Sequence, residues 1–283
     1  MTSLIRDEMP TVLVTGAATG IGLATARLLA ANKWRVLGTA LPDQDSTALR
    51  DAGAKIVEVD LTSRSSLTSL IRTVSATSRL DALVSNAGIA IPGPLEGLSA
   101  DELHLQFGLN TIAPMILAQG VLPQLRASGG RMIFMGAGQG RAALPFGGPY
   151  GASKAALAAL TDALRTEIAD SGVAVSLIEP SAVRTDILTT TRERGQALLD
   201  RLPHDIAERY RDPMRATFAR SEKALRGAIA PDTLSQLVLR VLTTPNPKPR
   251  YLVGREAVGL AFLALLPARQ RAKLVSRISR TRT

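Results

Sequence analysis

Tyr150 and Lys154 are the two residues whose types and spacing point most directly to proton chemistry. Four residues apart on a helix, their side chains share one face, with Cβ atoms roughly 5–6 Å apart. A free tyrosine has a pKa of about 10, which is too high for good proton transfer at neutral pH. An ammonium group about 4 Å away contributes about 4 kcal/mol at an effective dielectric constant near 20, or about three pKa units. The spacing predicts a tyrosine general acid/base assisted by lysine; the alternative is an exposed pair on a solvated helix face.

A second candidate is the glycine-rich segment Thr15–Gly22, which reads TGAATGIG. It follows a short apolar run and precedes a stretch of helical length. Glycines allow a tight turn and let backbone N–H groups approach a phosphate, and a helix N-terminus adds free donors and partial positive charge. In this context the segment predicts a pyrophosphate-binding loop, with a tight turn that binds nothing as the alternative.

The elements that must position these residues alternate between strand and helix. The short apolar runs typical of strands covered on both faces are Thr11–Thr15, Arg35–Thr39, Ile56–Val59, Ala82–Ser85, Met132–Met135, Val173–Ile178 and Tyr251–Val253. The stretches of helical length are Ile21–Asn32, Ser65–Thr77, Ala100–Leu125 and Gly151–Ala169. The alternation predicts an α/β fold with a doubly wound parallel sheet in a single domain over residues 10–255, after an N-terminal tail of residues 1–9.

Residues 187–227 interrupt this alternation with a polar, arginine-rich stretch of helical pattern that follows the end of a strand. Ligands of such sheets bind beyond the carboxyl ends of the strands. We therefore expect this insertion to be a helical substrate lid.

Composition excludes several classes of protein. Of 283 residues, 46% are hydrophobic and 20% charged, which excludes intrinsic disorder. The chain has no cysteine and only two histidines, His104 and His204, so we predict no metal site. The net charge of +10 comes largely from the last residues, and aromatics are 3%, so we expect no nucleic-acid partner. The N-terminus lacks the apolar stretch of a signal peptide, and we expect a cytoplasmic protein.

The order and spacing of several motifs resemble the short-chain dehydrogenase/reductase family. Thr15–Gly22 is similar to its cofactor loop, and Tyr150-Gly-Ala-Ser-Lys154 to its catalytic Tyr-x-x-x-Lys. Asn86-Ala-Gly88 is similar to its fourth-strand motif, with Ser85 for the commoner Asn, and residues 180–185 to its Pro-Gly-x-Val-x-Thr loop, with Ser181 for Gly. The resemblance covers roughly residues 10–255. It implies a Rossmann-like oxidoreductase that transfers a hydride between NAD(P) and a carbonyl/alcohol pair.

The resemblance also implies roles for single residues. Tyr150 is the general acid/base, Lys154 lowers its pKa and holds the nicotinamide ribose, and Asn110 supports a proton-relay water. The implied cofactor-binding residues are Gly16, Thr19, Gly20, Ile21, Gly22, Asp60, Leu61, Asn86, Ala87, Gly88, Tyr150, Lys154, Pro180, Val183 and Thr185. The alanine-rich helix that carries Tyr150 corresponds to a subunit interface in the family, which implies a homodimer or homotetramer.

One residue of the family pattern is absent. Thirteen positions before the tyrosine the family has a serine that hydrogen-bonds the substrate oxygen, and here that position is Ala137. Loss of one such donor typically costs about 10²–10³ in rate. Three interpretations stay open: an unusual reductase in which Gln139 or a water replaces the donor, a weakened cofactor-binding or regulatory protein, and a substitution introduced to trap a complex. Ala137 and Gln139 are the predicted substrate-binding positions.

The choice between NAD and NADP depends on the end of the second strand. An NAD site usually has an acid about 20 residues after the glycine loop, and Thr39-Ala40-Leu41 has none. Hydroxyls of Thr19 and Thr39 could contact a 2′-phosphate, which favours NADP, although Asp43 is near enough in sequence to favour NAD.

The C-terminal segment, residues 256–283, combines an apolar run, Ala257–Leu266, with six basic residues. The apolar run is about half the length needed to span a bilayer. One interpretation is a helix that lies on an anionic membrane surface; the other is a helix over the pocket or an interface, followed by a solvated tail. Val175–Pro180 and Arg250–Arg255 are similar to the family's steroid and retinol enzymes, which suggests an apolar substrate.

Overall fold

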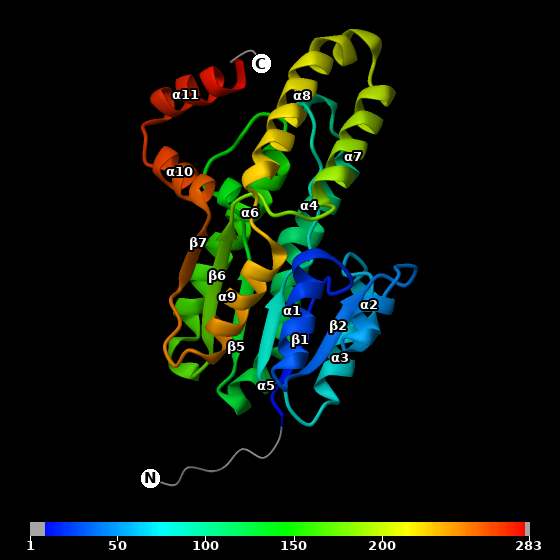
Figure 1. Cartoon of the computed structure of the whole chain (residues 1–283), viewed down its shortest axis with the longest axis vertical. Coiled ribbons are helices and arrows are strands. Elements are labelled where there is room, and N and C mark those ends of the chain that lie inside the picture. The colour runs from blue at the N-terminus through cyan, green and yellow to red at the C-terminus, as the bar shows by residue number, and fades with distance from the viewer. Residues whose placement is uncertain (1–8, 281–283) are drawn as a thin grey trace.

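A seven-stranded sheet forms the centre of the computed structural model, which describes residues 9–280 (Figure 1). The strand order is β3-β2-β1-β4-β5-β6-β7, and every pairing is parallel. The strands are β1 Thr11–Val14, β2 Arg35–Ala40, β3 Lys55–Glu58, β4 Ala82–Ser85, β5 Arg131–Met135, β6 Ala174–Pro180 and β7 Arg250–Val253. All seven predicted strands are present, and the doubly wound, single-domain Rossmann-like fold is confirmed. The predicted tail, residues 1–9, lies outside the described residues except for Met9.

The central strands of the sheet are buried on both faces and are apolar at successive positions. Leu13, Leu83 and Phe134 point to one layer, where they pack against α3, α5 and α6. Val12 and Ile133, which alternate with them, point to the other layer, formed by α1, α2 and α9. Burial on both sides explains why these strands read as continuous apolar runs rather than as alternating patterns.

Helices connect the strands and cover the two faces. They are α1 Gly20–Ala31, α2 Thr47–Asp51, α3 Arg64–Ser75, α4 Ala100–Phe107, α5 Ala113–Ser128, α6 Gly148–Glu167 and α9 Pro231–Thr243. The predicted helix over 100–125 is present and extends to Ser128. Its middle part, Gly108–Ile112, is π-helical instead of α-helical. Sequence patterns predicted neither α2 nor α9.

The insertion at residues 187–227 forms two helices, α7 Ile187–Arg201 and α8 His204–Ala224, followed by a 3₁₀ turn. Figure 1 shows them side by side, extending beyond the carboxyl ends of the strands. Their contacts to the body include an Arg201–Glu102 ion pair and a hydrogen bond from Tyr210 to Glu96. The helical structure and its location match the expectation, and the function as a lid stays a prediction.

The chain ends in α10 Arg255–Ala264 and α11 Ala268–Arg280. Within residues 9–280, one helical run, Ala100–Ser128, is long and apolar enough to cross a membrane. Its Leu117, Val121 and Leu125 are fully buried in the core, which accounts for its apolar composition.

Candidate active site

Tyr150 and Lys154 lie in the first two turns of α6, at the carboxyl end of β5. Lys154 is 5% exposed, and its Nζ donates a hydrogen bond of 2.8 Å to the carbonyl oxygen of Met135, the last residue of β5. The same Nζ lies 6.0 Å from the centre of the Tyr150 ring. The lysine therefore bridges the sheet edge and the tyrosine, rather than lying on a solvated face.

Burial shifts the pKa values of this pair, and the shift of the tyrosine is opposite to the prediction. Burial lowers the pKa of Lys154 to about 8 and raises the pKa of Tyr150 to about 12. Loss of hydration disfavours the charged form of each group, and at 6.0 Å the attraction between them is weaker than at the assumed contact distance. Tyr150 therefore stays protonated over the physiological pH range, in the form that a proton donor needs.

Asn110 is completely buried, in the π-helical segment between α4 and α5. Its Oδ1 accepts a hydrogen bond from Ile89 N (2.9 Å), and its Nδ2 donates to Ile89 O (2.9 Å) and to Ser153 Oγ (3.1 Å). Ser153 in turn donates to the carbonyl oxygen of Tyr150 (2.8 Å). A π-helical segment is rare and often marks a functional site. Here it brings the Asn110 side chain between the end of β4 and α6.

Gln106 binds the same loop as Asn110, since both side chains donate to Ile89 O. Sequence patterns did not identify Gln106. It is fully buried one helical turn earlier, where it accepts from Ile91 N (2.7 Å) and donates to Ile89 O (2.8 Å). The side-chain amides of Gln106 and Asn110 therefore make hydrogen bonds to backbone N–H and C=O groups of the loop after β4. The available sequence signal was the i, i+4 spacing of Gln106 and Asn110.

Gly88 lies at the point where these elements meet. A Cβ atom at Gly88 would stand 3.1 Å from Asn110 Oδ1 and 3.5 Å from Lys154 Nζ. The end of β4, the π-helical segment and α6 thus converge on one spot at the carboxyl edge of the sheet. The structure brings together Gly88, Asn110 and Lys154, three of the predicted site residues.

The glycine-rich turn joins β1 to α1, and its glycines are required by the backbone. Gly16 and Gly20 have φ values of +61° and +53°. A Cβ at Gly22 would stand 2.0 Å from Gly16 O, which leaves no room for any side chain. This turn leads into α1, whose first N–H groups have no partner inside the helix, so the turn and the helix start together form a cradle of the kind that suits a pyrophosphate. Thr19 is exposed beside it and Ile21 is partly buried.

The loop after β4 holds this cradle in place. Thr15 Oγ1 accepts hydrogen bonds from Asn86 N (2.9 Å) and Ala87 N (3.0 Å). Asn86 Nδ2 donates to Thr15 O (3.0 Å) and to Gly16 O (3.3 Å). The side chain of Asn86 thus contacts the backbone of the turn, which is a positioning role in addition to the predicted cofactor contact.

Thr39 does not have the environment that was predicted for it. It is 2% exposed, and its Oγ1 accepts a hydrogen bond of 3.0 Å from Gly16 N. This hydroxyl stabilises the glycine turn by accepting from its backbone. It can reach the turn because β2, which carries Thr39, pairs directly with β1. Leu41 and Asp43, one and three residues after β2, are exposed. Of the two threonines proposed for a 2′-phosphate, only Thr19 is accessible.

The remaining predicted cofactor residues lie along the same edge. Asp60 is partly exposed after β3, and its Oδ1 accepts from the backbone and hydroxyl of Thr62, while Leu61 is buried in the core. Pro180 ends β6, and Val183 is buried in a bridge to Ile229. A Cβ at Gly20 would stand 3.0 Å from Thr185 Cγ2, so this loop contacts the glycine turn.

Ala137 and Gln139 belong to the tight turn that follows β5. Ala137 is 7% exposed and extended, and the 3₁₀ turn Gly138–Gly140 packs against the start of α6. A Cβ at Gly151 would stand 3.0 Å from Gln139 O, so turn and helix contact each other through backbone. The structure therefore places both predicted substrate positions beside α6, with no hydroxyl at the position of the family's serine.

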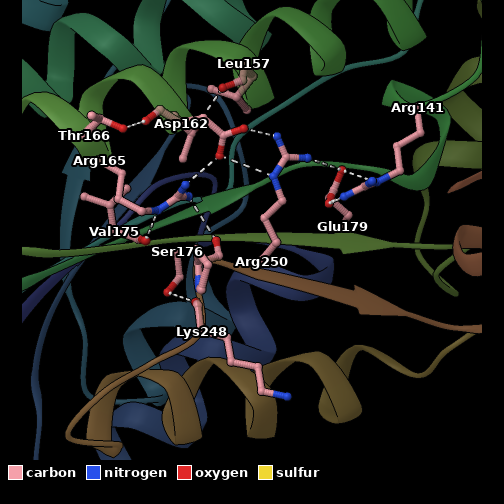
Figure 2. Close-up of polar contacts among 12 residues, drawn as sticks. Arg141, Leu157, Asp162, Arg165, Thr166, Val175, Ser176, Glu179, Lys248 and Arg250 are labelled. Atoms are coloured by element: carbon pink, nitrogen blue, oxygen red, sulfur yellow. Dashed lines mark hydrogen bonds and ion pairs between the residues drawn. The ribbon is translucent and has the colours of Figure 1, made fainter. Parts of the chain in front are cut away.

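An ion-pair network holds this turn against the sheet, and Figure 2 shows its members. Glu179 on β6 is 1% exposed and accepts two hydrogen bonds from Arg141, at 3.0 and 2.6 Å. Arg250 on β7 lies 3.5 Å from the same carboxylate and also pairs with Asp162 on α6. Arg165 belongs to the same network because its Nη1 forms an ion pair with Asp162 Oδ1 at 2.6 Å. Sequence patterns identified none of these residues as part of the site.

Among the described residues, no cluster of three or more His, Cys, Asp or Glu side chains could hold a metal ion.

The parallel sheet, with a glycine cradle after β1 and a buried lysine beside a partly buried tyrosine after β5, defines a dinucleotide-binding fold of the doubly wound class. A family model described as short chain dehydrogenase matches residues 10–196. The chain belongs to the short-chain dehydrogenase/reductase family of oxidoreductases.

Two relatives align over most of the chain. The 3-amino-tetrahydro-pyrrolizinone reductase of Xenorhabdus hominickii is 31% identical over 250 residues, which cover 87% of each chain. Retinol dehydrogenase 16 of Homo sapiens is 29% identical over 268 residues, 90% of this chain and 83% of the relative.

Two solved structures are similar. A short-chain dehydrogenase from Sphingobium yanoikuyae in complex with NADPH has a TM-score of 0.68 and 25% identity, over 97% of this chain and 98% of that one. One from Burkholderia phymatum in complex with NAD has a TM-score of 0.75 and 22% identity, over 94% and 95%. Similar structures therefore bind either nicotinamide dinucleotide.

Proposed function

We propose that this chain is an NADP-dependent reductase or dehydrogenase of an apolar carbonyl/alcohol pair. The observation that carries the proposal is the convergence of Gly88, Asn110 and Lys154 beside Tyr150, at the same sheet edge as the glycine cradle. This is the edge at which doubly wound sheets bind their ligands.

The fit to a dinucleotide comes from the glycine turn. Gly16 and Gly20 give the turn its positive φ values, and a pyrophosphate would lie against the first N–H groups of α1, which have no partner inside the helix. Thr185 and Pro180 would border the nicotinamide end, and Lys154 would hold its ribose. When bound, the reduced cofactor supplies the hydride for the substrate carbon.

The chain's own residues supply the proton. Burial keeps the Tyr150 hydroxyl protonated, so it can donate its proton to the substrate oxygen as the carbon–oxygen double bond is reduced. In the oxidative direction the same oxygen takes a proton back from the alcohol. Lys154 contributes positive charge that stabilises the phenolate formed during transfer, and Asn110 fixes the loop that borders the site.

Ala137 removes one of the two donors that the family directs at the substrate oxygen. We infer that the reaction depends on Tyr150 alone or on Gln139, which lies in the same turn. The competing proposal is a weakened cofactor-binding or regulatory protein, and the methyl group at position 137 is the observation that favours it.

Kinetics of two variants test these proposals. We expect Tyr150→Phe to lower kcat by about 10²–10⁴, because it removes the hydroxyl that donates the proton, while NADPH binding is retained through the glycine turn. We expect Ala137→Ser to raise kcat by about two orders of magnitude. The assay follows NADPH oxidation across steroids, retinoids, quinones and short ketones. NADPH binding without turnover in any variant would instead support the binding protein.

NADP is preferred in this proposal because Thr39, Ala40 and Leu41, at the end of β2, include no acid that would hold a ribose 2′-OH or repel a 2′-phosphate; the nearest acid, Asp43, lies three residues after the strand. Leu41 is exposed there, and the Thr19 hydroxyl is accessible beside the cradle. An apolar substrate is supported by the apolar contacts of the predicted lid with the loop before α4. A Cβ at Gly93 would stand 2.1 Å from Cδ2 of Leu198 on α7, and a Cβ at Gly97 would stand 2.8 Å from Cδ2 of Leu202, the residue after α7.

A further inference from the structure

Helix α10 has one buried face and one exposed apolar face. Ala257 and Leu263 are buried, 0% and 8% exposed, and they fix the helix to the body. Val258, Phe262 and Leu265 are 40%, 68% and 80% exposed. Their spacing of four and three residues places them in one row along the helix. Three large apolar side chains in a single exposed row are unusual for a surface that meets only water.

The segment that follows this row is strongly basic. Residues 257–283 contain six Arg or Lys and no Asp or Glu. Arg269 and Lys273 on α11 are exposed, and Arg271 Nη1 donates to Ala264 O (3.3 Å), which ties α11 to the end of α10. The apolar row and the cations thus lie on two consecutive helices that are tied together, and we call their exposed residues the α10–α11 surface.

This surface lies at the catalytic end of the molecule. In Figure 1, α10 and α11 extend beyond the carboxyl edge of the sheet, at the same end as α7 and α8. Helix α10 packs on the turn that contains the substrate position, since a Cβ at Gly138 would stand 2.8 Å from Ala257 Cα. A flat partner bound at the α10–α11 surface would therefore lie at the active-site end.

We propose that the α10–α11 surface binds the surface of an anionic lipid bilayer. An apolar row inserts at the boundary between headgroups and acyl chains, while adjacent cations contact acidic headgroups. A second copy of the chain is a poor occupant, because a two-fold interface would place two sets of cations with no acid opposite each other. The phosphate groups of a nucleic acid would pair with the cations, but the apolar row would stay exposed to water.

Vesicle co-sedimentation of the full chain tests this proposal without any assay of turnover. We expect the chain to pellet with vesicles of phosphatidylcholine mixed with phosphatidylglycerol and to stay in solution with phosphatidylcholine alone. Binding weakens as salt is added, because exposed charges are screened. The result does not depend on the proposed reaction, since a chain that lacks the activity would bind vesicles equally well.

Two double variants separate the contributions. Phe262→Gln with Leu265→Gln weakens binding by at least about tenfold, because both side chains lose their burial in lipid. Arg269→Glu with Lys273→Glu weakens it by more than about tenfold, since each cation near an anionic surface contributes about fivefold. Arg35→Glu with Lys55→Glu is the matched control: it makes the same charge change at the amino ends of β2 and β3 and leaves binding within about twofold.

Three outcomes would overturn the proposal. In the first, the chain stays in solution with every vesicle composition. In the second, Arg35→Glu with Lys55→Glu weakens vesicle binding as much as Arg269→Glu with Lys273→Glu. In the third, Phe262→Gln with Leu265→Gln lowers the molar mass in solution and leaves vesicle binding unchanged, which assigns the row to a subunit interface. Retained NADPH binding and an unchanged Tm verify that each variant is folded.

Discussion

At the residue scale, the site depends on two groups whose charge states are set mainly by burial. Tyr150 is held protonated, and Lys154 loses its proton more readily than a free lysine. The Lys154 ammonium is nevertheless satisfied by Met135 O, so it is a buried cation with a fixed partner. A lysine that titrates near pH 8 gives the reaction a pH dependence that can be assigned to one residue.

We expect kcat/KM for carbonyl reduction to be constant below pH 8 and to fall above it. The reason is that Lys154 must carry its charge, which it loses as pH rises through about 8, whereas Tyr150 stays protonated until about 12. The measurement is a pH–rate profile of wild type and Lys154→Arg. Because arginine keeps its charge at all these pH values, the variant loses the fall near pH 8, even if its rate is lower. An identical fall in both proteins contradicts the assignment.

The pH dependence of the free energy of unfolding provides an independent check of the lowered pKa of Lys154. The unfolded state holds the Lys154 proton up to about pH 10.5 and the native state only up to about 8. The free energy of unfolding of wild type therefore rises, relative to Lys154→Met, as pH increases from 8 to 10.5. The slope is at most about 1.4 kcal/mol per pH unit. Urea unfolding of both proteins at several pH values measures it, and a constant difference would show that the pKa is not lowered.

The sequence predicted residues that occur in local motifs and missed those that act through distant partners. Tyr150, Lys154 and the glycines were found because their function fixes their spacing. Gln106 and Ser153 were missed because a buried glutamine or serine has no distinctive pattern until its partners are known. The pKa of Tyr150 was predicted in the wrong direction because burial, which sequence does not give, outweighs a cation at 6.0 Å.

At the element scale, the carboxyl edge is fixed by polar contacts between elements rather than within them. Asn110 and Gln106 connect the α4–α5 run to the loop after β4, and Glu179 connects β6 to the turn after β5. Strands were predicted well because burial on both faces leaves a continuous apolar run. The Arg141–Glu179 and Arg250–Asp162 pairs could not be predicted, since the partners are 38 and 88 residues apart.

We expect Arg141→Met to lower the free energy of unfolding by about 3–5 kcal/mol. The substitution leaves the buried carboxylate of Glu179 with one weaker partner, Arg250 at 3.5 Å. Urea unfolding measures the effect. The double variant Arg141→Met with Glu179→Leu is the control, and it recovers most of the loss because no charge is left unpaired. A loss below about 0.5 kcal/mol for Arg141→Met would show that the pair does not hold the turn.

At the scale of the whole molecule, two groups of exposed apolar side chains within residues 9–280 bear on the choice of partner. One is the α10–α11 surface, and the other is formed by the outer faces of α4 to α6. The exposed apolar residues of the latter are Leu105, Ile112, Ile116 and Leu160. This second surface includes α6, the helix that the family resemblance assigns to a subunit interface. We propose that a second copy of the chain covers it.

Light scattering after size-exclusion chromatography tests this assembly. We expect wild type to have two or four times the chain mass of 29.9 kDa, and Ile112→Arg with Ile116→Arg to shift it to a smaller species. Burying two unpaired cations in an apolar interface is strongly unfavourable, which is the reason for the shift. Met9→Arg, at an exposed residue before β1, is the control and leaves the mass unchanged. A monomeric wild type contradicts the assembly.

The central claim is that a nicotinamide dinucleotide binds across the carboxyl edge, with its pyrophosphate at the glycine turn. Fluorescence titration of wild type, Gly22→Ala and Gly227→Ala with NADPH and with NADH tests it most directly. A Cβ at position 22 would stand 2.0 Å from Gly16 O, whereas one at Gly227 meets no atom within 4 Å. The account predicts that wild type and Gly227→Ala bind NADPH more tightly than NADH, while Gly22→Ala binds at least about a hundredfold more weakly. Wild type that binds neither nucleotide, or a folded Gly22→Ala that binds as tightly as wild type, would contradict it.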